Sequence, residues 1–254
     1  MVFEPYGTLL SMESITQKLA DHVFEKAQTV TAMWRRCQPE YMWRLNGMGN
    51  IHYPSQTPRM VKFTRHFETG KYEPFPTVMV RSLQHALREA GLILNEPSLD
   101  KSHGVREPSP FHLPGRLRGP CKARNDSKHD RSNGTDAIVS SSLLNPLSPC
   151  AHYFKRIVTV EEIKRYKPAP EVYEMLAQKV GKEKEEVRKI WLVSENPVDV
   201  VGARAVGMQA VWVDRAESSF GWADRLVEGE EGRLTAVVRG LSEIAEIVKR
   251  HKYT

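Results

Sequence analysis

Hydrophobic residues recur every three to four positions along two stretches in the first hundred residues of the chain. Residues 12–49, with a hinge or two, and residues 74–92 show this spacing, which predicts amphipathic helices. Gly91 lies at the end of the second stretch, where a glycine commonly stops a helix. Residues 50–70 lie between them, contain two prolines and follow no clear period. We interpret this intervening segment as an atypical insertion.

After residue 150, short apolar runs alternate with helical patterns. The sequence predicts strands in "YFKRIVTVEEI", "KIWLVSE" and "QAVWVDR", and helices in "APEVYEMLAQKVG", "PVDVVGARAVG" and "LTAVVRGLSEIAEIVKRH". A further short strand at Val2-Phe3 precedes a turn at Pro5-Tyr6-Gly7. Strand–helix–strand repetition with short connections implies right-handed parallel crossovers. The fold class is therefore predicted to be α/β with a parallel sheet.

Residues 95–131 differ in character from the rest of the chain. From Asp100 to Arg131 the sequence holds four prolines, three glycines and many charges, with almost no apolar clusters. Such a composition does not readily bury a core face, and a structureless loop of this length is uncommon inside a compact domain. We interpret residues 95–131 as an irregular segment that is disordered or out of frame. In particular, we expect "ARNDSKHDR" not to form a buried parallel strand, which should be almost continuously apolar.

Charge and cysteine content exclude several function classes. The net charge of +6 is concentrated in the two irregular segments, so no structured basic face for nucleic acid is predicted. No apolar run reaches transmembrane length, and the N-terminus lacks the pattern of a signal peptide, so we expect no membrane association. Three cysteines far apart, Cys37, Cys121 and Cys150, argue against a disulfide framework and a closed zinc site. A reducing, cytoplasmic location is the expectation.

Polar clusters follow several of the predicted strands. Ligands bind at the carboxyl ends of the strands in open α/β sheets, so these clusters are candidates for a site. They are Glu4 with Thr8, Ser132-Asn133-Gly134-Thr135, Lys167, and Ser194-Glu195-Asn196 with Asp199. Each also has an ordinary structural interpretation: Glu4 as a solvated charge at a strand end, Lys167 as a loop lysine, and Asp199 as a helix-N-terminal acid.

The order and spacing of these motifs resemble one known family. "FEPYGTL", "WRRCQPEYMW", "KYEPF", "SNGT", "YKPAPEVY" and "VSENPVDVVGARAVG" together are similar to the L-2-haloacid dehalogenases of the haloacid-dehalogenase-like superfamily. The resemblance implies a doubly wound parallel sheet, the Rossmannoid core of that superfamily, with a small helical cap inserted after the first strand. The core would comprise residues 1–10 and 120–254, and the cap residues 11–94.

The resemblance also implies a mechanism and roles for individual residues. A carboxylate attacks Cα of an L-2-haloacid, halide leaves, and water hydrolyses the resulting ester, which is covalent catalysis without a cofactor or metal. Glu4 stands at the position of the family's nucleophilic Asp, and Lys167 would keep that carboxylate ionised. Asp199 would orient Lys167 or activate water, Thr8 would hydrogen-bond the nucleophile or its partner, and Arg35 would stabilise the leaving halide.

Further residues are assigned to the substrate by the same resemblance. Ser132 and Asn133 would bind the substrate carboxylate. The remaining residues would line the site or shape an apolar pocket: Tyr6, Tyr41, Trp43, Phe75, Tyr173, Ser194 and Asn196. Trp34 and Trp212 carry no such role, and we expect Trp212 in the core.

The chain departs from the family pattern in four places. Position 4 is Glu instead of Asp, and a displacement of about 1 Å can cost roughly 10²-fold in rate. The first strand is clipped, the apolar strand expected before Ser132 is missing, and residues 50–70 interrupt the cap. We hypothesise that residues 50–70 and 95–131 lie outside the family's reading frame, as retained introns or frameshifts would produce. A continuous spliced transcript that encodes both segments would contradict this.

Three functions are therefore compared. The first is a hydrolase of carbon–halogen bonds in small-molecule 2-haloacids, impaired by Glu4 or not. The second is a magnesium-dependent phosphatase of the same superfamily, which Tyr6 opposes because related phosphatases carry a second Asp there. The third is a catalytically inactive relative. The resemblance allows a homodimer, and neither nucleic acid nor membrane is an expected partner.

Overall fold

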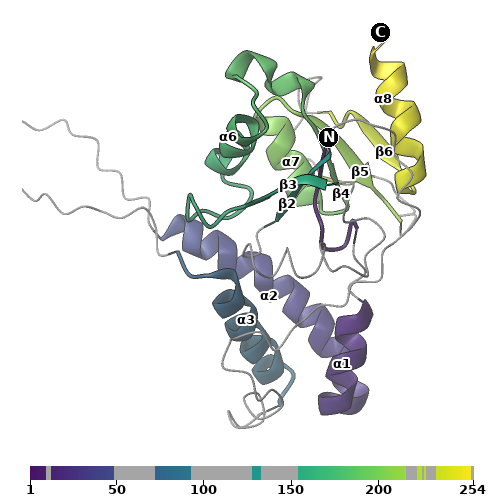
Figure 1. Ribbon diagram of the computed structural model, residues 1–254. Helices are drawn as coiled ribbons and strands as arrows, with labels where there is room; N and C mark the ends of the chain where they lie inside the picture. Colours follow the sequence, from purple (N-terminus) through teal and green to yellow (C-terminus); the bar gives the residue numbers. More distant parts are fainter. Residues whose placement is uncertain are drawn as a thin grey trace, which may run out of the picture.

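The computed structural model describes residues 1–9, 13–48, 72–92, 128–132, 154–215, 222–224, 226 and 233–252 (Figure 1). The strands are β1 (Val2–Phe3), β2 (Lys128–Ser132), β3 (Phe154–Thr159), β4 (Trp191–Ser194), β5 (Gln209–Val213) and β6 (Ala236–Val238). The α-helices are α1 (Glu13–Val23), α2 (Ala27–Gly47), α3 (Phe75–Glu89), α6 (Pro170–Lys179), α7 (Pro197–Ala205) and α8 (Ile244–Lys252). Three short 3-10 helices are also described: η1 (Phe24–Lys26), η3 (Lys184–Lys189) and η4 (Leu241–Glu243).

The six strands form one parallel sheet in the order β3-β2-β1-β4-β5-β6. Side chains of successive strand residues point to opposite faces, so each strand contributes to two cores. On one face Val2, Leu192 and Ala210 pack with residues of α6 and α7. On the other face Phe3 and Val193 pack with residues of α8. Figure 1 shows α6 and α7 on one side of the strands and α8 on the other, the doubly wound arrangement that was predicted.

Helices α1, α2 and α3 lie together beyond one end of the sheet (Figure 1). The α2–α3 contact is organised by Trp34, whose side chain is fully buried. Its indole Nε1 donates hydrogen bonds to the Met79 carbonyl oxygen at 3.1 Å and to Ser82 Oγ at 3.0 Å. A buried indole needs a partner for its N–H, and the small Ser82 on the facing helix supplies one. The helical predictions for residues 12–49 and 74–92 are confirmed within the described residues.

Two sequence predictions are wrong in this structure. Residues 128–132 form the parallel strand β2, although "ARNDSKHDR" was expected not to form a buried parallel strand and residues 128–131 fall in the segment 95–131 that was expected to be irregular. β2 lies between β1 and β3, so its backbone groups find partners on both sides whatever its side chains are. The segment 234–251, predicted as one helix, begins instead with strand β6, which pairs with β5. Its Ala-Val-Val run completes the sheet edge, and Gly240 separates it from the helix.

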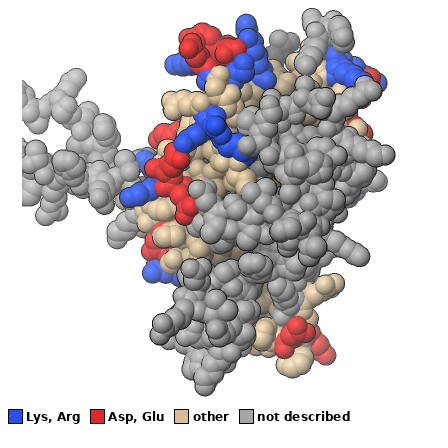
Figure 2. Space-filling model, in the orientation of Figure 1, with Lys and Arg blue, Asp and Glu red and all other residues tan. Residues whose placement is uncertain are grey.

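The described surface carries charges of both signs side by side. Figure 2 shows Lys and Arg next to Asp and Glu over the described part of one face. The ion pairs Arg36–Glu89 and Arg81–Glu73 are examples. Among the helices of the described ranges, none has the length and apolar character that crossing a bilayer would require.

Candidate active site

A cavity of about 190 Å³ lies where the carboxyl ends of the strands face the helices α2 and α3. Glu4 follows β1, and its backbone N–H extends the ladder by donating to the Val193 carbonyl oxygen at 3.0 Å. Lys167 lies in the connection from β3 to α6, and Asp199 lies in the first turn of α7, after β4. The lining consists of Glu4, Tyr6, Arg35, Gln38, Pro39, Met42, Trp43, Phe75, Lys167, Asn196, Val198 and Asp199.

A buried ion pair lies at the floor of this pocket. Lys167 Nζ is 2.7 Å from Asp199 Oδ2, and the two side chains are 6% and 1% exposed. Tyr173 is fully buried and donates its hydroxyl to Asp199 Oδ1 at 3.1 Å. Gly202 makes this approach possible, since a Cβ there would lie 2.3 Å from the Tyr173 hydroxyl oxygen. Asp199 is thereby held from both sides, as a buried charge requires.

Local sequence fixes the turn that carries Asp199. Asn196 is the N-cap of α7, and its Oδ1 accepts a hydrogen bond from the Val198 backbone N–H at 3.0 Å. Pro197 occupies the first helical position, where its missing N–H has no consequence. Ser194 Oγ accepts from the Asn196 backbone N–H at 3.0 Å. The motif "SENP" (residues 194–197) thus ends β4 and begins α7 directly under the pocket.

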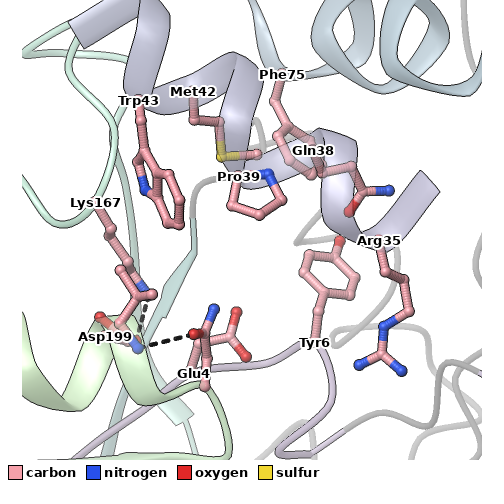
Figure 3. A pocket seen from close by; sticks show the side chains of 12 residues that line it. Glu4, Tyr6, Arg35, Gln38, Pro39, Met42, Trp43, Phe75, Lys167 and Asp199 are labelled. Carbon is pink, nitrogen blue, oxygen red and sulfur yellow. Dashed lines mark hydrogen bonds and ion pairs between the residues drawn. The ribbon is translucent and has the colours of Figure 1, made fainter. Parts of the chain in front are cut away.

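Glu4, Lys167 and Asp199 lie together at one end of the pocket (Figure 3). Glu4 is 9% exposed. The helix α2 contributes Pro39, Met42 and Trp43 above these polar groups, as Figure 3 also shows. A carboxylate beside an ammonium group and under an apolar wall is suited to nucleophilic attack on an electrophilic carbon of a small molecule. Water is partly excluded there, which strengthens the electrostatic interactions of the site.

The other end of the pocket holds Arg35 and Tyr6, with the Tyr6 ring between Arg35 and Glu4 in the view of Figure 3. The Arg35 side chain is 55% exposed, and its Nη2 lies 3.8 Å from Glu195 Oε1. Glu195 Oε2 also pairs with Arg215 Nη1 at 3.2 Å. Arg35 therefore belongs to a short chain of charges at the mouth of the pocket.

Comparison with known proteins agrees with this geometry. A model of the haloacid dehalogenase-like hydrolase family matches residues 137–213. The (S)-2-haloacid dehalogenase 2 of Pseudomonas sp. (strain CBS-3) is 24% identical over 98% of this chain and 94% of its own length. The haloacetate dehalogenase H-2 of Moraxella sp. (strain B) is 26% identical over 87% of each chain. These matches relate the chain to the haloacid dehalogenase-like hydrolases.

A solved structure carries the same fold. The L-2-haloacid dehalogenase of Xanthobacter autotrophicus, with chloropropionic acid covalently bound, superimposes with a TM-score of 0.70 at 20% identity. The match covers 98% of this chain and 97% of that one. The likeness supports the α/β, haloacid-dehalogenase-like fold that the sequence predicted.

The structure brings most of the predicted site residues to this one pocket. Those that line it are Glu4, Tyr6, Arg35, Trp43, Phe75, Lys167, Asn196 and Asp199. Tyr173 and Ser194 were expected to line the site, but they lie beneath it, because both are fully buried and bonded to the start of α7. Thr8 is also buried, and its Oγ1 accepts a hydrogen bond from the Glu195 backbone N–H at 2.8 Å.

The predicted carboxylate-binding pair is placed only in part. Ser132 ends β2, whose residue Asp130 pairs with Phe3 of β1, so the end of β2 is next to the strand end that carries Glu4. Asn133 lies outside the described residues. The sequence lacks the apolar strand expected before Ser132, but the polar strand β2 takes that place, and the backbone of Ser132 thereby reaches the expected edge of the sheet.

Sequence reasoning missed several lining residues and one neighbouring pair. Gln38, Pro39 and Met42 line the pocket, and the last two follow Arg35 by four and seven positions on one helix face. That spacing was a usable signal, because such residues share a face. The neighbouring pair is Glu195 with Arg215. Glu195 was part of the predicted polar cluster after β4 but was given no role, and Arg215 follows β5, where a strand-end residue of an α/β sheet could have been suspected.

One metal-ligand cluster exists among the described residues, and it is not in the pocket. Cys37, His85 and Glu89 place one ligand atom each within 4.8 Å of the others on the α2–α3 surface. Arg36 Nη2 already donates to both Glu89 oxygens, at 2.5 and 2.6 Å, and this guanidinium lowers the pKa of Glu89. A cation in contact with the cluster opposes a second one, so these residues do not fit a metal ion well.

Proposed function

We propose that the chain hydrolyses the carbon–halogen bond of short L-2-haloacids, with Glu4 as the nucleophile. A Glu4 carboxylate oxygen attacks Cα of the substrate, a C–O ester bond forms, and the halide leaves with the electron pair of the broken bond. Water then attacks the ester carbonyl carbon, which releases the 2-hydroxy acid and returns the carboxylate, with one proton passing to solvent. Carbon, oxygen and charge balance over the two steps, and no cofactor is required.

The observation that carries this proposal is the presence of the Glu4 carboxylate and the Lys167–Asp199 pair in one pocket with an apolar wall. Lys167 favours the ionised nucleophile by its charge, and Asp199 orients Lys167 or activates the hydrolytic water. The names of the relatives, which are 2-haloacid and haloacetate dehalogenases, support the same substrate class.

The other residues take supporting roles in this proposal. Arg35 stabilises the departing halide, and Ser132 with Asn133 holds the substrate carboxylate. Thr8 braces the backbone after β4 that leads to Asp199. Trp43 and Phe75 form apolar walls, and Tyr6 with Asn196 completes the lining. We retain residues 11–94 as the cap, residues 1–10 with 120–254 as the core, and a cytoplasmic location as parts of the proposal.

Halide release from L-2-chloropropionate tests the proposal, measured with and without magnesium on the purified full chain. We expect halide release that magnesium does not change. We also expect Glu4→Asp to be faster by up to roughly 10²-fold, because the shorter side chain places the carboxylate oxygen at the distance from the backbone that the family's Asp gives. Glu4→Gln, which cannot attack as an anion, is the matched control and should be inactive. Magnesium-dependent release of phosphate from a phosphate ester, with no halide release by either protein, would favour the phosphatase instead.

Failure of both reactions would leave the inactive-relative interpretation. The Glu4→Asp variant separates two reasons for such inactivity. If that variant folds like the wild type by circular dichroism and releases halide, the extra methylene at position 4 is the cause. If it folds and releases none, the site fails for a reason other than the reach of the nucleophile.

A further inference from the structure

The guanidinium of Arg35 is drawn away from the nucleophile in this structure. Its described ion pair is with Glu195, at 3.8 Å between Arg35 Nη2 and Glu195 Oε1. In Figure 3 the Tyr6 ring lies between Arg35 and Glu4, and the Arg35 side chain extends away from Glu4. At 55% exposure this side chain has room to change its rotamer, whereas Glu4 is buried. For the proposed role in stabilising the halide, this guanidinium would have to turn from Glu195 towards Glu4.

Glu195, in contrast, is held in place from several directions. Its backbone N–H donates to Thr8 Oγ1 at 2.8 Å, and its carbonyl oxygen accepts from Trp212 Nε1 at 3.0 Å. Its Oε2 pairs with Arg215 at 3.2 Å. Its carboxylate also lies against Gly7, where a Cβ would be 2.3 Å from Oε1. The carboxylate is therefore a fixed anion, and Arg35 is the movable partner.

We propose that Glu195 is a positioning residue that restrains Arg35 at the mouth of the pocket, so that an incoming anion must compete with Glu195 for this guanidinium. The inference rests on the proposed function in taking Arg35 as the cation that receives the halide. Its consequence is specific: the Glu195 carboxylate weakens the binding of halide and substrate anions and speeds the loss of the product halide. Removal of that charge should release Arg35 to the pocket.

A structural role for Glu195 is the competing explanation. Arg215 Nη1 and Nη2 donate to the carbonyl oxygens of Gly7 and Thr8, at 3.0 and 2.6 Å, and Glu195 could serve only to hold Arg215 on this turn. The substitution Glu195→Gln separates the two roles. The amide oxygen can still accept from Arg215, whereas the negative charge that attracts Arg35 is gone.

The test follows binding of bromide through the side-chain Nε–Hε resonance of Arg35 in NMR spectra, assigned by its loss in Arg35→Lys. We expect the resonance to shift saturably in the wild type, and Glu195→Gln to bind bromide about two- to fivefold more tightly, the range for a partly exposed ion pair. In dehalogenation assays Glu195→Gln should show a lower KM and a slower release of halide. If Glu195 has only a structural role, the substitution should lower Tm and leave bromide affinity unchanged.

A double-mutant cycle completes the test. In the Arg35→Gln background the Glu195→Gln substitution should no longer change bromide affinity, measured by calorimetry, because the effect passes through Arg35. An equal gain in both backgrounds would overturn the proposal in favour of simple repulsion between Glu195 and the anion. No shift of the Arg35 resonance with bromide in folded wild-type protein would also overturn it. Bromide binding can be measured without turnover. A chain that binds bromide but does not dehalogenate would therefore contradict the proposed function and still test the role of Glu195.

Discussion

Removing the ammonium group of Lys167 should expose how much the pocket depends on a paired charge. Lys167→Met keeps nearly the same side-chain length and volume but leaves Asp199, which is 1% exposed, without its ion-pair partner at 2.7 Å. Breaking a buried pair by removal of one partner typically costs about 3–5 kcal/mol.

Urea unfolding of wild type, Lys167→Met and two double variants at pH 7 measures this cost. We expect Lys167→Met to lose about 3–5 kcal/mol, with a similar m-value. The double variant Lys167→Met/Asp199→Asn should recover most of the loss. If Lys167→Met/Glu4→Gln recovers it instead, Glu4 is the charge that Lys167 compensates. An equal loss in the single variant and in both double variants would refute the argument from buried charge.

Three further predictions concern stability. Trp34→Phe should lower the free energy of unfolding by about 1–2 kcal/mol, because the indole donates to two acceptors on α3; an unchanged urea midpoint would contradict this. Gly7→Ala should destabilise the fold more than Gly207→Ala does in thermal unfolding: both have a φ near +90°, at +91° and +85°, but only at Gly7 would a Cβ meet Glu195. The pKa of Glu186 is lowered from 4.5 to about 2 by hydrogen bonds from two lysines. The contribution of this carboxylate to the free energy of unfolding is therefore present above pH 4.5 and is lost as the pH falls towards 2. The stability difference between wild type and Glu186→Gln should therefore narrow over that range in urea titrations, and a constant difference would count against it.

The elements that the sequence predicted correctly are those with a regular apolar pattern. β4 and β5 are buried on both faces, so "WLVS" and "AVWV" are almost continuously apolar. The helices α2 and α3 bury one side each, which produces the period of three to four residues that identified them. For the same reason, strand ends could be located, and with them Glu4 and Asp199.

The elements that it did not predict depend on neighbours distant in the chain. β2 has the sequence "KHDRS", and its place in the sheet depends on backbone pairing with β1 and β3. The local sequence does not predict this pairing. The burial of Tyr173 depends on Gly202, 29 positions later, whose missing side chain leaves space for the hydroxyl. The pairing of Arg35 with Glu195 likewise joins helix α2 to the end of β4. Such contacts are set by tertiary packing, and a single sequence gives only their separate parts.

The backbone around position 4 gives a reason why one methylene in the proposed nucleophile should matter in this fold. β1 is only two residues long, but it pairs with β2 on one side and β4 on the other. The Glu4 backbone N–H donates to the Val193 carbonyl oxygen at 3.0 Å, so the ladder continues through the residue that carries the carboxylate. Retreat of this Cα by about 1 Å would break hydrogen bonds inside the sheet, each worth about 0.5–1.5 kcal/mol. The sheet therefore fixes the origin of the side chain, and the length of the residue sets how far its oxygen reaches into the pocket. With Lys167 and Asp199 locked by their own pairing, a substrate must adjust to Glu4, and shortening this residue to Asp changes the distance of attack while it leaves the surrounding charges in place.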